Sequence, residues 1–159
     1  MDIVIELMNE DDIGPVARLR MAAFFDGAGR TLDEDMAGLH GLLTGGDGLE
    51  VSLVARVDGE LAGTVLLVRD ELNAAHDVTP WLAGLVVGPA FRGCGVGTAL
   101  VRAVEAHGCA QGVETLHLYT WEARRFYASL GWRAVERFEE DDGPMMLMSR
   151  RLSYNLPAR

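Results

Sequence analysis

The sequence lacks long apolar runs and has only two cysteines. No stretch approaches the roughly 18 apolar residues that a membrane-spanning helix requires. The acidic N-terminus MDIVIELMNEDD also lacks the basic segment that opens a secretory signal. We therefore expect no membrane contact and a cytoplasmic protein. Cys94 and Cys109 could form at most one disulfide, which is no framework for a secreted fold, so both are expected to be free thiols.

Positive charge is also scarce. The chain carries 14 Lys and Arg residues against 24 Asp and Glu residues, and its formal net charge at pH 7 is -10. Binding to a nucleic-acid backbone depends on clustered cations that displace counterions, so this balance argues against a nucleic-acid partner. A cationic small molecule or peptide is electrostatically the easier ligand.

The residues that are present suit one folded domain. The chain has 159 residues, of which 49% are apolar and 24% are charged, and single domains commonly contain roughly 100 to 200 residues. No internal repeat, low-complexity segment or linker interrupts the sequence. We expect one domain over residues 1–159.

Local signals mark where several elements begin and turn. Asn9, followed by acidic residues, predicts a helix start, and Thr31 with Glu34 has the spacing of a capping box. Asp58 and Gly59 suit a two-residue hairpin turn. Hydrophobic periodicity predicts strands over 2–7, 49–57, 60–69, 81–87, 114–120, 132–140 and 145–152, with a turn over 141–144. It predicts helices that end near 25, cover 32–44, run from the glycines near 97 to about 112, and cover 123–130.

The predicted order of elements is therefore βααβββαβαββ. This order corresponds to an α/β (α+β) domain with a mixed central sheet of about seven strands flanked by about four helices. The strand WLAGLVV, over 81–87, has no polar alternation, as expected of a strand that is buried on both faces.

A glycine-rich bend, FRGCGVGTAL, connects that strand to the next helix. Gly93, Gly95 and Gly97 allow a backbone without Cβ atoms to turn its N–H groups toward one point at the positive end of the helix dipole. The bend is either an ordinary turn or a cradle for a phosphate, and three glycines favour the cradle. A P-loop is excluded because no Gly-Lys-Ser or Gly-Lys-Thr follows, and Thr98 replaces the third glycine of the dinucleotide-binding fingerprint.

The remaining pattern is Arg-x-x-Gly-x-Gly, formed by Arg92, Gly95 and Gly97. It resembles the acetyl-coenzyme A loop of the GNAT superfamily, the Gcn5-related N-acetyltransferases. A second segment, TWEARRFYASLGW, is similar to the family's helix motif. Its matching residues are Ala123, Phe126, Tyr127, Gly131 and Trp132, with Thr120 where the family often has Asn. Together with the order of elements, the resemblance covers nearly the whole chain.

This resemblance implies the GNAT fold and an acetyl-coenzyme A-dependent N-acetyltransferase, which moves an acetyl group directly to a primary amine of a small molecule or peptide. It implies no metal and no cysteine nucleophile, so Cys94 is expected to be incidental. The backbone N–H of Val86 or Val87 would bind the thioester oxygen, and the glycine loop would bind the pyrophosphate. The cofactor-binding residues that the resemblance implies are Leu85, Val86, Val87, Arg92, Gly93, Cys94, Gly95, Val96, Gly97 and Thr98.

Tyr127 occupies the position at which many relatives place a tyrosine that protonates the leaving thiolate. Its spacing is equally that of a core aromatic residue, and with the resemblance we favour the catalytic role. Relatives often carry a glutamate base on the strand before the loop, but WLAGLVV has no ionisable residue. A non-catalytic acyl-coenzyme A sensor is therefore kept as the alternative function. The base is left open among Glu71, His76, Asp77, His117 and a water chain.

Acceptor specificity in this superfamily comes from the first two helices, the loop before the central strand and the closing hairpin. These segments contain an acidic set of residues, which favours a cationic amine. The set comprises Asp26, Asp33, Glu34, Asp35, Glu71, Asp77, Glu139, Glu140, Asp141 and Asp142. Members of the family are frequently dimers, so a homodimer is also considered, although no interface feature stands out.

Overall fold

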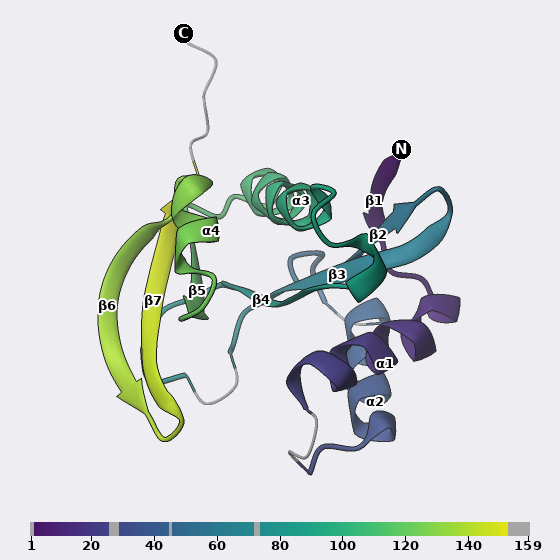
Figure 1. The fold of residues 1–159 in the computed structure, drawn as a ribbon, viewed down its shortest axis with the longest axis horizontal. Coiled ribbons are helices and arrows are strands. Elements are labelled where there is room, and N and C mark those ends of the chain that lie inside the picture. The colour runs from purple at the N-terminus through teal and green to yellow at the C-terminus, as the bar shows by residue number, and fades with distance from the viewer. Residues whose placement is uncertain (1, 26–28, 45, 72–73, 153–159) are drawn as a thin grey trace, which may run out of the picture.

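The computed structural model describes residues 2–25, 29–44, 46–71 and 74–152. They form one mixed seven-stranded sheet with the strand order β1-β2-β3-β4-β5-β7-β6 (Figure 1). The strands are β1 (Ile3–Leu7), β2 (Val51–Val57), β3 (Glu60–Val68), β4 (Trp81–Val87), β5 (Thr115–Thr120), β6 (Arg133–Glu140) and β7 (Gly143–Arg151). The helices are α1 (Ile13–Phe24), α2 (Leu32–Thr44), α3 (Val96–Ala110) and α4 (Arg124–Ser129), with short 3-10 helices η1 (Glu10–Asp12) and η2 (Pro89–Phe91). The predicted fold class and order of elements are confirmed.

The first helix begins later than its capping signal predicted. Asn9 caps η1, because its side chain accepts a hydrogen bond from the Asp12 N–H at 3.1 Å while the Asp12 carboxylate accepts from the Asn9 N–H at 2.9 Å. The α-helix proper starts at Ile13. The acidic residues after Asn9 therefore form a separate 3-10 turn that leads into α1.

The other predicted turns and caps are confirmed with one correction. The Thr31 N–H donates to Glu34 Oε1 at 2.7 Å and the Glu34 N–H donates to Thr31 Oγ1 at 3.0 Å, which is a complete capping box. Asp58 and Gly59 have φ values of 49° and 88°, as a two-residue hairpin turn requires. The closing hairpin is tighter than predicted, because β7 already begins at Gly143 and pairs with β6 from there.

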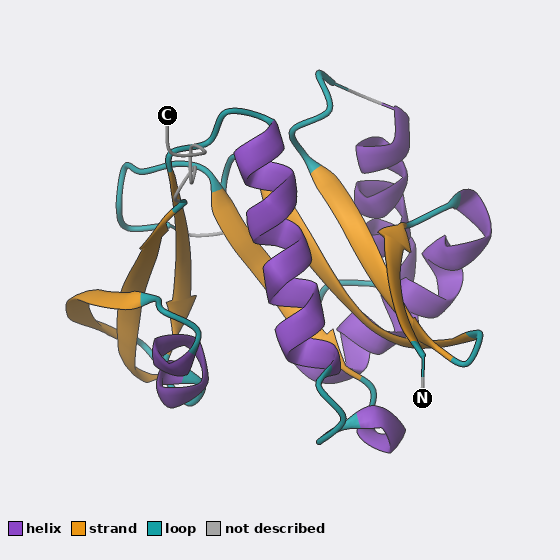
Figure 2. Cartoon of the chain, turned by 90° about the horizontal axis from the view of Figure 1, so that it is seen from above, coloured by secondary structure: helices purple, strands orange, loops and turns teal. Residues whose placement is uncertain are grey.

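Helices cover both faces of the larger part of the sheet. Helix α3 packs across β2, β3 and β4 on one face, and α1 and α2 pack on the opposite face (Figures 1 and 2). Because successive strand residues point to opposite faces, Leu53 belongs to the core beneath α3 while Val54 packs with Val16 of α1 and Leu39 of α2. No helix in the described residues is both long and apolar enough to cross a membrane.

Strands β4 and β5 are parallel neighbours that separate soon after they begin. Trp81 and His117 form the one register pair between them in the described residues, whereas β5 pairs with β7 along its whole length, from Thr115 to Thr120. Figure 1 shows β5, β6 and β7 as one wing of the sheet and β1 to β4 as the other. In this part of the chain, the edge of β4 beyond Trp81 that faces β5 has no strand partner.

Candidate functional site

A bulge interrupts β4 midway along its length. Leu66 of β3 lies opposite Ala83 and Thr64 lies opposite Val86, so two residues of β4, Gly84 and Leu85, face one residue of β3. Gly84 has a φ of 64°, a left-handed conformation that favours glycine. The bulge therefore falls directly before Val86, one of the two residues whose N–H was expected to bind the thioester oxygen.

The glycine loop leads from β4 through η2 into α3. Gly95 forms the N-terminal cap of α3 with a φ of 88°, and its carbonyl accepts the first helical hydrogen bond, from the Ala99 N–H at 3.0 Å. The N–H groups of Val96, Gly97 and Thr98, in the first turn, have no acceptor within the helix. They lie at the positive end of the dipole of a 15-residue helix, and this combination suits an anion.

The remaining loop residues support this bend. Gly93 also has a positive φ, 77°, which agrees with its expected part in the turn. The exposed Arg92 donates from Nε to the carbonyl of Val87 at 3.3 Å. The half-buried Cys94 donates weakly from Sγ to the Arg92 carbonyl at 3.6 Å, and both it and Cys109 are free thiols, as predicted.

A pocket of about 280 Å³ lies where β4 and β5 have separated. Tyr127 of α4 lines it and is only 5% exposed, with its ring packed edge-on against Phe126 and Trp132. Burial raises the pKa of the Tyr127 hydroxyl well above its ordinary value of 10.0. The phenol therefore keeps its proton over the whole physiological range and remains a hydrogen-bond donor. Tyr127 is thus a core residue that also lines a pocket, and its catalytic role stays a prediction.

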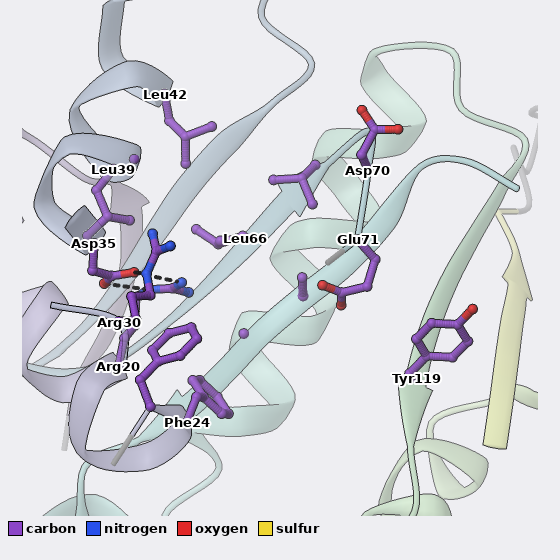
Figure 3. Close-up of a pocket in the computed structure, with 15 residues that line it drawn as sticks. Arg20, Phe24, Arg30, Asp35, Leu39, Leu42, Leu66, Asp70, Glu71 and Tyr119 are labelled. Carbon is purple, nitrogen blue, oxygen red and sulfur yellow. Dashed lines mark hydrogen bonds and ion pairs between the residues drawn. The ribbon is translucent and has the colours of Figure 1, made fainter. Parts of the chain in front are cut away.

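A larger pocket, of about 450 Å³, opens on the side of α1 and α2 (Figure 3). Part of its apolar wall comes from Leu39 and Leu42 of α2 and from Leu66 of β3. The two pockets meet at the β4 bulge, because they share Phe24, Glu71, Ala83, Gly84 and Tyr119. A bound molecule in either pocket would thus approach the same stretch of β4.

Two arginines and one aspartate form an ion-pair cluster on the wall of the larger pocket. Asp35 is 1% exposed and accepts hydrogen bonds from Arg20 Nε at 3.0 Å, from Arg20 Nη2 at 3.2 Å and from Arg30 Nε at 3.0 Å. This cluster was not anticipated. One signal did exist in the sequence, because Arg20 continues the stripe of Val16 and Ala17 that α1 buries, and a charged residue on a buried stripe requires a partner.

Tyr119 belongs to a chain of hydrogen bonds at the rim of the pocket. Its hydroxyl accepts from the Ala75 N–H at 3.1 Å and lies 2.6 Å from His76 Nδ1, and His76 Nε2 lies 2.9 Å from Glu136 Oε1. Burial raises the pKa of Tyr119, while its hydrogen bonds to Ala75 and His76 lower it. These hydrogen bonds connect the loop before β4 with β5 and β6.

The four candidate bases line different sets of pockets. Glu71 lines both pockets and also a third hollow, which it shares with Asp77 and with His76, whose ring nitrogens are already hydrogen bonded. His117 lies beside Trp81, with Nδ1 3.2 Å from the Pro80 carbonyl oxygen, and burial lowers its pKa. Glu71 is thus the candidate that lies where the two pockets meet.

The expected acidic rim is only partly present around the larger pocket. Of the acidic set, Asp35 and Glu71 line it in the described residues, Glu34 lies in its capping box, and Asp26 lies outside the described residues. Asp35 is buried in its ion pairs, so the described residues at this wall place two guanidinium groups, of Arg20 and Arg30, against one carboxylate. Among the described residues, no cluster of potential metal ligands occurs.

Solved structures share this arrangement of elements. An aminoglycoside 6'-N-acetyltransferase complexed with coenzyme A matches with a TM-score of 0.76 and 17% identity, over 94% of this chain and 97% of that one. A GNAT-family acetyltransferase from Streptococcus pneumoniae matches with a TM-score of 0.74 and 19% identity, over 96% of this chain and 100% of that one. At these identities the matches show the fold.

Sequence comparison adds two findings. A mycothiol acetyltransferase from Nocardia farcinica (strain IFM 10152) is 40% identical over 94 residues, which are 59% of this chain but only 29% of that relative. This chain thus spans less than a third of that relative's length. The family model for the acetyltransferase (GNAT) domain matches residues 49–134. Because this match extends over more than half of the chain, from β2 through the glycine loop and α4, the protein belongs to the GNAT family of acetyltransferases.

Proposed function

We propose that the protein is an acetyl-coenzyme A-dependent N-acetyltransferase, which moves an acetyl group directly to the primary amine of a small molecule or peptide. The meeting of two pockets at the bulge of β4 carries this proposal. One pocket lies in the gap between β4 and β5, and the other opens toward α1 and α2. A thioester in one pocket and an amine in the other would meet at Ala83 and Gly84, which line both.

The cosubstrate-binding residues are proposed from this geometry and from family membership. The first-turn N–H groups of Val96, Gly97 and Thr98 fit a pyrophosphate because no helical acceptor uses them. The exposed guanidinium of Arg92 adds a charge-assisted donor beside them. The unpartnered edge of β4 from Leu85 to Val87 suits an extended pantetheine arm with amide groups, in the manner of an added strand.

The chain supplies three functions to the reaction, in which the thioester provides an acyl group activated for attack. The N–H of Val86 or Val87 donates to the oxygen on which negative charge develops. Tyr127, kept protonated by burial, donates its proton to the departing sulfur. Glu71 accepts the proton that the ammonium must lose before its nitrogen can attack, directly or through water. A C–S bond breaks, a C–N bond forms, and one proton is released overall.

Measurement of free thiol tests the proposal. The protein is mixed with acetyl-coenzyme A and a panel of amines that includes an aminoglycoside, amino acids and peptides, and thiol release is followed over time. Direct transfer predicts that thiol release depends on the amine. It also predicts that double-reciprocal plots of the initial rate, taken at several amine concentrations, intersect. Parallel lines, together with loss of turnover in Cys94→Ala, would indicate an acyl-enzyme on Cys94 instead. Binding of acetyl-coenzyme A without thiol release for any amine would support the sensor.

A further inference from the structure

The α1–α2 wall of the larger pocket carries one more positive charge than negative charge in its ion-pair cluster. Arg20 and Arg30 both bind Asp35, and the side chain of Asp35 is 1% exposed. Two guanidinium groups therefore face one carboxylate in the described residues of this cluster. A buried charge is costly unless it is paired, so a pocket wall with one surplus cation is suited to a bound anion.

The Nη1 atom of Arg20 marks where such an anion would bind. It is buried and has no hydrogen-bond partner in the described part of the chain, although the same guanidinium uses Nε and Nη2 on Asp35. It also lies against the bulge, because a Cβ added to Gly84 would be only 2.5 Å from Nη1. Glycine at position 84 thus gives the guanidinium room to reach the point where the two pockets meet.

A purely structural role for the cluster explains only part of it. The pair of Arg20 with Asp35 already links α1 to α2. The second arginine also has a structural contact, because Arg30 Nη2 donates to the Glu34 carbonyl at 3.4 Å. Neither contact explains the unpaired Nη1 of Arg20. Arg30 is 31% exposed and lines the same pocket, so a ligand can reach this second guanidinium from solvent.

The opposite wall of the pocket carries carboxylates. Figure 3 shows Asp70 and Glu71 across the pocket from Arg20 and Arg30. Apolar side chains of α2 and β3, among them Leu39, Leu42 and Leu66, line the space together with these charged groups. A molecule in this pocket would therefore meet cations on one side, anions on the other and an apolar surface between them.

We infer that the acetyl acceptor is a compact zwitterion, an amine that carries a carboxylate a few bonds away, in the manner of an α-amino acid with an apolar side chain. This inference rests on the proposed acetyl transfer. The carboxylate binds Arg20 and Arg30, whose planar donors match its two oxygens, and the ammonium faces Glu71 at the bulge. A monoanion neutralises the single surplus charge. The net charge of the whole chain suggested a cationic amine, whereas the charges that line this pocket favour a zwitterion.

Matched acceptors test the inference. Thiol release is compared for L-leucine and L-leucinamide, and for L-phenylalanine and L-phenylalaninamide, in which an amide replaces the negatively charged carboxylate and the side chain is the same. The expected kcat/KM is at least about tenfold higher for each acid, since charge-assisted hydrogen bonds to a desolvated arginine are lost with the amide. The amides hold more free amine at a given pH, so this preference would arise against the chemical bias. Equal or better turnover of the amides would overturn the inference.

Variants assign the preference to the two arginines. Arg20→Met and Arg30→Gln are each expected to lower the ratio of kcat/KM for the amino acid to kcat/KM for its amide toward one. The KM for acetyl-coenzyme A should stay unchanged. Arg18→Gln is the matched control, because Arg18 is an exposed cation on the same helix that does not line the pocket. Arg20 is buried, so melting temperature is measured for each variant. The partly exposed Arg30 carries the test if Arg20→Met does not fold, and an unchanged ratio in Arg30→Gln would contradict the inference.

A binding measurement separates this inference from the proposed function. Calorimetry with L-leucine and L-leucinamide, with and without coenzyme A, requires no turnover. If the wild type binds leucine, Arg30→Gln does not, and no amine gives thiol release, the anion site would be supported and acetyl transfer would be overturned. Turnover of both ligands at equal rates would retain acetyl transfer and overturn the anion site.

Discussion

Trp81 and His117 face each other at the point where β4 and β5 separate. Their ring centroids are 5.8 Å apart, and they are the one register pair between the two strands in the described residues. The indole of Trp81 is 1% exposed and donates from Nε1 to the Val78 carbonyl at 3.0 Å. The gap between β4 and β5 opens from this junction, and the loop before β4 ends at it.

The stability of this junction is expected to depend on pH through His117. Burial lowers the pKa of His117 below its ordinary value of 6.5, and the Pro80 carbonyl offsets only part of that effect. Near pH 6 the unfolded chain therefore binds more protons at this site than the folded chain, so stability falls as the pH drops below about 6.5. Urea unfolding at pH 7.5 and 5.5 is expected to show a smaller acid loss in His117→Gln than in the wild type. His40→Gln, at an exposed position on α2, should follow the wild type, and equal acid losses in all three proteins would contradict the prediction.

Tyr127→Phe is expected to reduce kcat by about 10²-fold or more, which is the usual contribution of a positioned general acid. The KM for acetyl-coenzyme A should change little, because the ring stays in its apolar contacts with Phe126 and Trp132. The raised pKa of Tyr127 also predicts that the wild type loses no activity through this group up to about pH 10. Steady-state kinetics across pH check both points. Tyr119→Phe, which removes the other phenol at the pocket, is the control, and an unchanged kcat in Tyr127→Phe would remove its role as acid.

The order of elements and the glycine loop could be predicted from the sequence because both depend on local chemistry. Apolar periodicity, a capping box and positive-φ glycines are readable within about ten residues. The ion pair of Arg20 with Asp35 could not be predicted, because it depends on how α1 packs against α2. The position of the bulge was not predicted from the sequence, although Gly84 inside an apolar run was its signal. No local sequence pattern indicates the separation of β4 and β5, because it arises from the pairing of β5 with β7.

Gly84→Ala is expected to destabilise the protein by about 1–3 kcal/mol, because a residue with a Cβ is strained at the φ of this bulge. The new methyl group would also displace Nη1 of Arg20, so kcat/KM for the acceptor should fall. Gly41→Ala on α2 is the matched control, because among the described residues outside its own helical backbone no atom lies within 4 Å of its added Cβ. Alanine in a helix should be neutral or stabilising there. Denaturant unfolding and steady-state kinetics provide the comparison, and equal stability of the two variants would contradict the assigned strain.

The two ends of α3 offer a test of the loop that separates strain from binding. Gly95 precedes the helix with a φ of 88° and Gly112 follows it with a φ of 85°, and in the described part of the chain an added Cβ at either site would have no atom within 4 Å apart from those of its immediate neighbours. Substitution by alanine at either site should cost about 1–2 kcal/mol for the left-handed conformation. Only Gly95→Ala is expected to raise the KM for acetyl-coenzyme A, because it alters the amides at the N-terminus of the helix. An equal rise in KM for Gly112→Ala would show that the effect is one of stability alone.

Asp35→Asn is expected to be the most destabilising single change in the pocket wall. The substitution leaves Arg20, with a side chain 8% exposed, without its carboxylate, and removal of one partner from a buried ion pair typically costs about 3–5 kcal/mol. Asp33→Asn, at an exposed position on the same helix, should change the free energy of unfolding by less than about 0.5 kcal/mol.

A double variant then distinguishes charge from packing. With Asp35 neutralised, Arg30 only adds a second unpaired cation beside Arg20. Asp35→Asn combined with Arg30→Gln is therefore expected to lose less stability than the sum of the two single variants. Urea unfolding of the four proteins of this cycle gives the coupling free energy directly. Simple additivity would mean that the two arginines do not share one carboxylate in solution, and the surplus charge of the pocket wall would have to be placed elsewhere.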